Sequence, residues 1–122
     1  MRLRQVAQRA EDLDRAVAFY RDTVGLSLLA RFDPPGLAFF DLDGVRLLVE
    51  RGASSALLYL ATDDIDARVE TLRSAGVTIE TEPHIIFRDD EGVFGAPGTE
   101  EWMAFFRDSE DNLVGLVERR PT

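Results

Sequence analysis

The sequence contains no cysteine, which excludes a disulfide framework, a thiol nucleophile and a thiolate metal site. No apolar run approaches the roughly 18 residues that a membrane helix needs. The two arginines among the first four residues are not followed by the apolar stretch of a signal peptide. We therefore expect a cytoplasmic protein that has no membrane partner.

The motifs of several enzyme classes are also missing. No Gly-x-Gly-x-x-Gly follows a strand-like segment, and no Walker-type loop ends in Gly-Lys-Ser. No serine lies in a Gly-x-Ser-x-Gly elbow. The glycine-rich stretch 92–98 has neither a lysine nor a helical segment after it, which argues against phosphate binding. The net charge of −9 repels nucleic acid, so we expect no nucleic-acid partner.

What the chain does have is the composition of one globular domain. Its 122 residues are 45% hydrophobic and 30% charged, which is typical of folded and not of disordered proteins. A chain of this length buries enough surface to form a hydrophobic core without disulfides or a structural metal. We therefore expect a single domain over residues 1–122.

An internal repeat is the most informative feature of the sequence. Four segments return in the same order: 10–17 at 62–69, 23–26 at 74–77, 37–40 at 103–106, and 49–51 at 117–119. Four matches in one order are not expected by chance. The repeat divides the domain into module one, residues 1–52, and module two, residues 56–120.

Each module predicts one strand, one helix and three further strands. Asp12 and Asp64 precede the apolar stripes of the helices and are placed to accept hydrogen bonds from the first turn. Gly25 and Gly76 follow the stripes, where a left-handed residue ends a helix. The expected strands cover 3–9, 27–32, 37–41 and 45–50, then 57–61, 78–88, 102–107 and 113–118. The sequence therefore predicts an α+β fold, with a curved mixed sheet forming a cup and the helices on its convex face.

Two of these segments resemble a known family. The stretch Asp-Leu-Asp-Arg-Ala-Val-Ala-Phe-Tyr-Arg-Asp-Thr-Val-Gly-Leu at 12–26 is similar to a signature of the vicinal oxygen chelate superfamily, which comprises glyoxalases, bleomycin-resistance proteins and extradiol dioxygenases. Asp-Ser-Glu-Asp-Asn at 108–112 resembles the turn that precedes the last strand of that family. The resemblance implies paired βαβββ modules, a ligand cavity in the sheet and a homodimer.

The resemblance also implies positions for a metal, and the residues there do not suit one. The first ligand of the family, a His or Gln, corresponds to Gln5, and its repeat equivalent corresponds to Leu57. The final Glu of the family falls on Gly115, and its counterpart in module one on Leu47 or Arg46. A divalent ion needs several charged or imidazole donors that converge. We therefore expect no metal and no other cofactor; the alternative is one displaced divalent metal ion.

His84 is the only histidine and lies in an alternating segment, Glu-Pro-His-Ile-Ile-Phe-Arg. Alternation predicts that His84 shares a strand face with Ile86 and Arg88, opposite Ile85 and Phe87. An imidazole and a guanidinium together suit a carboxylate or phosphate ligand, or acid–base chemistry. The other interpretation is a solvated surface histidine beside a solvated arginine.

Trp102 follows two acids, Glu100 and Glu101, directly after the glycine-rich loop. One interpretation is an aromatic wall of the cavity with a carboxylate at its rim. The other is that Trp102, Ala104 and Phe106 belong to the core beneath the helix, with the acids in water. The sequence leaves both interpretations open.

The expected function is the binding of a small anionic or aromatic molecule without a metal. The alternative is a glyoxalase-like lyase, isomerase or epimerase that uses His84 with Glu100 or Glu101 as catalytic residues, with or without a displaced metal. Gln5 is expected in the cavity, where a buried amide needs hydrogen-bond partners. The expected ligand-binding residues are Gln5, Phe39, Arg46, Tyr59, Arg88, Trp102 and Phe105.

Overall fold

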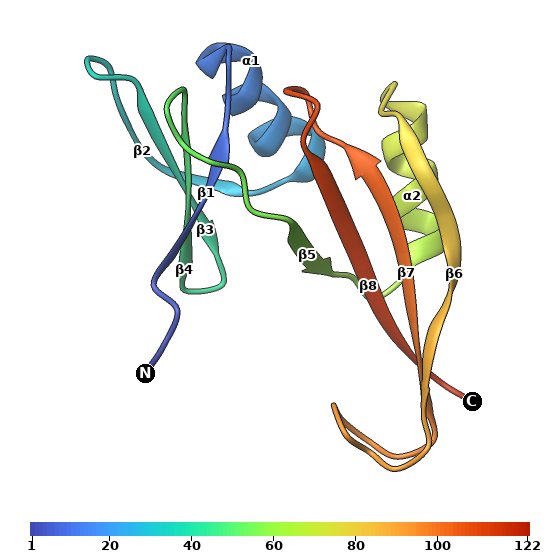
Figure 1. The fold of residues 1–122 in the computed structure, drawn as a ribbon. Coiled ribbons are helices and arrows are strands. Elements are labelled where there is room, and N and C mark those ends of the chain that lie inside the picture. The colour runs from blue at the N-terminus through green and yellow to red at the C-terminus, as the bar shows by residue number, and fades with distance from the viewer. The chain divides into compact units, whose positions relative to one another are not determined.

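The computed structural model describes all residues of the chain, Met1–Thr122. Figure 1 shows the path of the chain through its helices and strands. In order these are β1 (Gln5–Arg9), α1 (Leu13–Ala18), η1 (Phe19–Val24), β2 (Ser27–Phe32), β3 (Leu37–Leu42), β4 (Val45–Glu50), β5 (Leu58–Ala61), α2 (Ile65–Ser74), β6 (Ile79–Asp89), β7 (Thr99–Arg107) and β8 (Leu113–Pro121). No helix is both long enough and apolar enough to cross a membrane.

The chain forms two compact units, each with its own four-stranded sheet. Unit 1 comprises Met1–Ala56 and Asp108–Asn112, and unit 2 comprises Leu57–Arg107 and Leu113–Thr122. The strand order is β1-β4-β3-β2 in unit 1 and β5-β8-β7-β6 in unit 2. In both sheets the first strand pairs in parallel and the other pairs are antiparallel. The predicted α+β fold with two tandem βαβββ modules is therefore confirmed.

Both helices begin and end at the predicted residues or close to them. The side chains of Asp12 and Asp64 accept hydrogen bonds from the backbone N–H groups of Arg15 and Ala67, both at 3.1 Å. These bonds satisfy donors that have no partner inside the helix. The first helix continues through the π-helical segment η1, and Gly25 ends it with a φ of 88°. A positive φ of this size favours glycine.

In each unit the helix packs on one face of the sheet and forms the core there. Helical and strand residues of unit 1 that are at most 3% exposed are Ala16, Val17, Tyr20, Ala38, Phe40, Leu47 and Val49. The corresponding buried residues of unit 2, at most 6% exposed, are Leu58, Ile65, Val69, Leu72, Ala104, Phe106, Val114 and Leu116. We call the other side of each sheet its open face, because no helix covers it. On the two open faces, side chains of the sheets are therefore not covered by a helix.

A turn from module two completes unit 1. The Asp108 carboxylate accepts a hydrogen bond from the Tyr20 hydroxyl at 2.6 Å, and Glu110 accepts one from the backbone N–H of Asp12 at 2.9 Å. Glu110 also forms an ion pair with Arg15 at 2.7 Å. Asn112 donates to the backbone carbonyl of Arg9 at 2.9 Å. Segment 108–112 thus belongs to the unit built by the first repeat, although the second repeat encodes it.

Candidate open-face binding sites

The open face of the unit 1 sheet brings together three of the predicted ligand-binding residues. Gln5 on β1 lies in register with Arg46 on β4, and Arg46 lies in register with Asp41 on β3. Phe39 on β3 pairs with Leu48, two residues after Arg46. Residues paired in register project from the same face of a sheet. Since the core residues Leu47 and Val49 alternate with these positions, Gln5, Arg46 and Phe39 share the open face.

Arg46 and two phenylalanines form an aromatic and cationic group on this face. The Arg46 guanidinium carbon lies 5.9 Å from the centre of the Phe39 ring, within reach of a cation–π interaction. The Phe32 and Phe39 rings meet edge to face with centres 6.0 Å apart. Phe32 is not in the predicted set. The register shift between Leu28 and Ala30 on β2 places it on the open face, and simple alternation from Leu28 would have placed it on the other face.

The open face of the unit 2 sheet carries a second aromatic pair, over a glycine. Tyr59 on β5 and Phe105 on β7 both lie in register with Gly115 on β8. Their rings meet edge to face with centres 6.0 Å apart. A Cβ atom added to Gly115 would lie 2.9 Å from Tyr59 Cδ1, closer than real Cβ contacts, and 3.0 Å from Phe105 Cε1, tighter than most. The two rings therefore occupy the space that a side chain at position 115 would need.

His84 lies on the same open face, because it pairs with Met103 on β7. Its Nδ1 is 2.9 Å from the backbone carbonyl of Glu82. A carbonyl oxygen only accepts hydrogen bonds, so Nδ1 carries the proton of the neutral ring, and the lone pair of the imidazole is on Nε2. His84 is exposed, so Nε2 is accessible to solvent or to a ligand.

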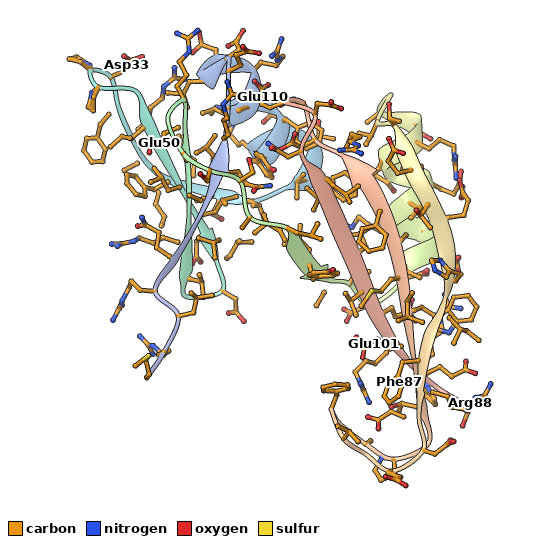
Figure 2. All side chains as sticks on the ribbon, in the orientation of Figure 1. Asp33, Glu50, Phe87, Arg88, Glu101 and Glu110 are labelled. Carbon is orange, nitrogen blue, oxygen red and sulfur yellow. The ribbon has the colours of Figure 1, made fainter.

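The prediction that His84 shares a face with Arg88 is wrong. The register of β6 against β7 shifts between Ile85 and Phe87, so that Phe87, and not Ile86, pairs with Glu101. This bulge reverses the alternation after residue 86. Arg88 consequently pairs with Glu100 and forms an ion pair with it at 2.7 Å, on the helix-bearing face. Figure 2 labels Phe87, Arg88 and Glu101 in this region.

The two predicted catalytic acids also lie on opposite faces. Glu101 is on the open face with His84 and is bound to Arg119 at 3.0 Å. Glu100 is on the helix-bearing face with Trp102, whose Nε1 donates to Glu100 at 3.3 Å. The Arg120 guanidinium carbon lies 4.2 Å from the centre of the Trp102 ring. Trp102, like Ala104 and Phe106, therefore belongs to the side beneath the helix.

A hydrogen-bond network at Asp89, which the sequence did not predict, fixes the loop at one end of the unit 2 open face. Asp89 is fully buried and accepts hydrogen bonds from the backbone N–H groups of Val93 at 2.7 Å and Phe94 at 3.0 Å. Arg119 forms an ion pair with it at 2.7 Å. Phe94 meets Phe87 edge to face, with ring centres 5.8 Å apart. The sequence shows that Asp89 lies at the start of a loop whose backbone N–H groups it could bind. It does not show that Arg119, 30 positions later, is its ion-pair partner.

Acid should weaken this loop network. Burial alone raises the pKa of Asp89, but hydrogen bonds from Arg119, Phe94 and Val93 lower it to about 2. Since this is below the unfolded value of about 3.9, Asp89 stabilises the fold fully above that value, and the contribution is lost as pH falls through about 2. We expect Asp89→Asn to lower the urea midpoint at pH 7, with a difference from wild type that shrinks on acidification. Asp90→Asn, at an exposed neighbour, is the control, and a pH-independent difference would contradict the assignment.

The positions implied for a metal do not form a suitable donor set. No three or more His, Cys, Asp or Glu side chains form a group able to hold a metal ion. Gln5 offers a neutral amide, Leu57 an exposed aliphatic chain, and Gly115 no side chain. The expected counterpart of Gly115 at Leu47 or Arg46 is also wrong. Tyr59 pairs with Gly115 as its repeat equivalent Ala7 pairs with Leu48, so the counterpart is Leu48, again without a donor.

A sequence model of the Glyoxalase/Bleomycin resistance protein/Dioxygenase superfamily matches residues 2–116. The chain belongs to this family. This confirms the resemblance of segments 12–26 and 108–112, because the family is the vicinal oxygen chelate superfamily. Membership establishes the fold and the modules, and it leaves the ligand and the reaction open because one scaffold supports many activities.

Individual relatives within this superfamily are distant. The chain is 24% identical to the uncharacterized protein YraH of Bacillus subtilis, over 97% of this chain and 98% of that protein. A lactoylglutathione lyase from Agrobacterium tumefaciens has a TM-score of 0.71 at 22% identity, covering 96% of this chain and 92% of the other. TnmS3, an antibiotic binding protein from Streptomyces sp. CB03234, has a TM-score of 0.68 at 23% identity, covering 100% and 97%. These likenesses show a shared fold.

Proposed function

We propose that this superfamily member binds a small aromatic or anionic molecule on its open faces without a metal ion. The observation that carries the proposal is the packing of Tyr59 and Phe105 over Gly115. At this position, where the resemblance implies a metal-binding carboxylate, the chain has two aromatic rings and no side chain. Aromatic rings offer stacking and edge-to-face contacts to planar ligands.

The exposure of these open faces also supports a ligand. Tyr59 is 52% exposed and Phe32 is 52% exposed, although both carry large apolar rings. Contiguous exposed apolar surface on a folded domain commonly marks a binding site. Among proteins of similar fold, TnmS3 is an antibiotic binding protein, which supports the binding of a small molecule by this scaffold.

Binding and metal content can be tested together. We expect protein purified without a chelator to contain only substoichiometric metal by elemental analysis. In a thermal-shift screen, planar aromatic compounds should raise the midpoint, since a ligand that binds only the native state stabilises it. Tyr59→Ala should reduce the shift. Ile85→Ala, on the helix-bearing face of the same sheet, should not.

Two results would contradict this function. One is a stoichiometric divalent metal that is lost on changing Gln5 or His84. The other is the absence of any aromatic compound that raises the midpoint of the wild-type protein.

One observation favours an enzymatic alternative. The contact of His84 Nδ1 with the Glu82 carbonyl leaves Nε2 as an accessible base on the unit 2 open face. A base of this kind serves proton abstraction in isomerases and epimerases. Turnover of a carbonyl substrate that disappears in His84→Gln, with unchanged thermal stability, would establish this alternative. We rank it second because Glu101, the acid on the same face, is engaged by Arg119.

A further inference from the structure

Arg46 differs from most basic residues of this chain. The protein carries a net charge of −9, and most of its arginines are neutralised by nearby acids. The ion-paired arginines are Arg15, Arg21, Arg31, Arg73, Arg88, Arg107, Arg119 and Arg120. Arg46 has no ion pair, and its guanidinium makes only the contact with the Phe39 ring. It therefore retains its hydrogen-bond donors for a partner that the chain does not supply.

The surroundings of Arg46 define the charge of that partner. Asp41 is in register beside it, but the Asp41 Oδ1 accepts a hydrogen bond from the backbone N–H of Gly44 at 3.0 Å and forms no ion pair with Arg46. Glu50 lies at the far end of the same face, in register with Leu37 (Figure 2). Because two carboxylates lie on the same face as the one free guanidinium, each added negative charge on a partner increases the net repulsion. We therefore expect a partner that is held by the guanidinium and carries a single negative charge, and not a dianion such as phosphate.

The uncharged residues next to Arg46 determine the shape of a partner that fits this face. Gln5 lies in register with Arg46 and offers an amide N–H at the same end of the sheet. Phe39 lies beneath the guanidinium, and Phe32 extends the aromatic surface away from it. A planar guanidinium binds a carboxylate through two parallel hydrogen bonds. An aromatic ring attached to that carboxylate would then lie along the phenylalanine pair.

We infer that the open face of the unit 1 sheet is a site for an aromatic monocarboxylate, with Arg46 as the residue that selects the carboxylate. Gln5 provides a further donor to the same group, and Phe39 and Phe32 provide the apolar contact for the ring. The inference rests on the proposed function and goes beyond it by naming the charge, the functional group and the sheet.

The test compares 2-naphthoate with 2-naphthamide, which has the same ring without the charge, by isothermal titration calorimetry. We expect wild type to bind naphthoate more tightly by roughly ten- to hundredfold, the usual gain from hydrogen bonds between charged groups. Arg46→Gln should remove this preference by weakening naphthoate binding far more than naphthamide binding, and Arg46→Lys should restore part of it. Arg68→Gln removes an exposed, unpaired arginine from α2 of unit 2 and is the matched control for net charge.

The possible outcomes separate this inference from the proposed function. Equal affinity of wild type for both compounds, or an undiminished preference in Arg46→Gln, would overturn the carboxylate site and leave aromatic binding intact. Tighter binding of 1-naphthyl phosphate than of naphthoate would overturn the choice of a monoanion. Failure of wild type to bind any of the three compounds would overturn the carboxylate site and count against the proposed function. In NMR spectra, the Arg46 Nε–H resonance should shift on addition of naphthoate and not on addition of naphthamide. This readout does not depend on affinity.

Discussion

Replacing Asp108 with alanine is expected to lower the free energy of unfolding by about 3 kcal/mol or more, since each orphaned buried donor costs roughly 1–3 kcal/mol. The Asp108 carboxylate accepts hydrogen bonds from the Tyr20 hydroxyl at 2.6 Å, from the backbone N–H groups of Glu110 and Asn112 at 2.8 Å, and from the Asn112 amide at 2.9 Å. Burial and the nearby Asp108 charge raise the pKa of Tyr20, so its hydroxyl remains a donor. Alanine would leave these donors without their partner.

Urea denaturation followed by circular dichroism measures this loss. Tyr20→Phe removes one of the four hydrogen bonds and should cost less than Asp108→Ala, and the two losses should not add, because the residues share a bond. Asp63→Ala, at an exposed aspartate before α2, is the control and should change stability little. Equal effects of the Asp63 and Asp108 substitutions would show that the turn does not stabilise unit 1.

Substitution of Gly115 should have the next largest effect. A Cβ at this position would overlap the rings of Tyr59 and Phe105, so Gly115→Ala is expected to cost about 1–3 kcal/mol, as overpacked sites usually do. Gly115→Glu should cost more, because it also places a carboxylate between two aromatic rings. Both substitutions should weaken binding of planar aromatic compounds by displacing the ring pair.

A double-mutant cycle distinguishes overpacking from other causes. In a Tyr59→Ala background the space over Gly115 is larger, so Gly115→Ala should cost clearly less than it does in wild type. Chemical denaturation of the four proteins measures the coupling between the two positions. An unchanged cost in the Tyr59→Ala background would mean that the ring of Tyr59 does not restrict position 115.

Much of the fold was predictable because the internal repeat carries the same helix and strand signals in both modules. Asp12 and Asp64 are helix caps in equivalent positions, and Gly25 and Gly76 end the helices with positive φ in both modules. Binary patterning then distinguishes core from open face, as on β4, where buried Leu47 alternates with exposed Arg46. The fold class and the succession of strands and helix along each repeat follow from such local signals, and the family resemblance added the expectation that Gln5 lies in the cavity.

The arrangement on β6 was not predictable in the same way. This strand has register shifts near Glu80, Pro83 and Ile86, and each inserts one extra residue opposite β7. Alternation assumes an uninterrupted pleat, so a single bulge between His84 and Arg88 moved the guanidinium to the other face. Bulges depend on how a strand meets its neighbour and have no reliable signature in one sequence. The counterpart of Gly115 was placed at Leu47 or Arg46 instead of Leu48 for another reason: the turns before β4 and β8 differ in length, and the sequence alone does not show where the gap between the repeats falls.

The position of segment 108–112 means that no continuous piece of the chain contains the whole of unit 1. Glu110 binds the start of helix α1, and Asp108 binds Tyr20 of the following segment η1; both acids are encoded after the second helix. A polypeptide ending near residue 56 would lack these contacts, so we expect the first half expressed alone to be unable to complete its own structure.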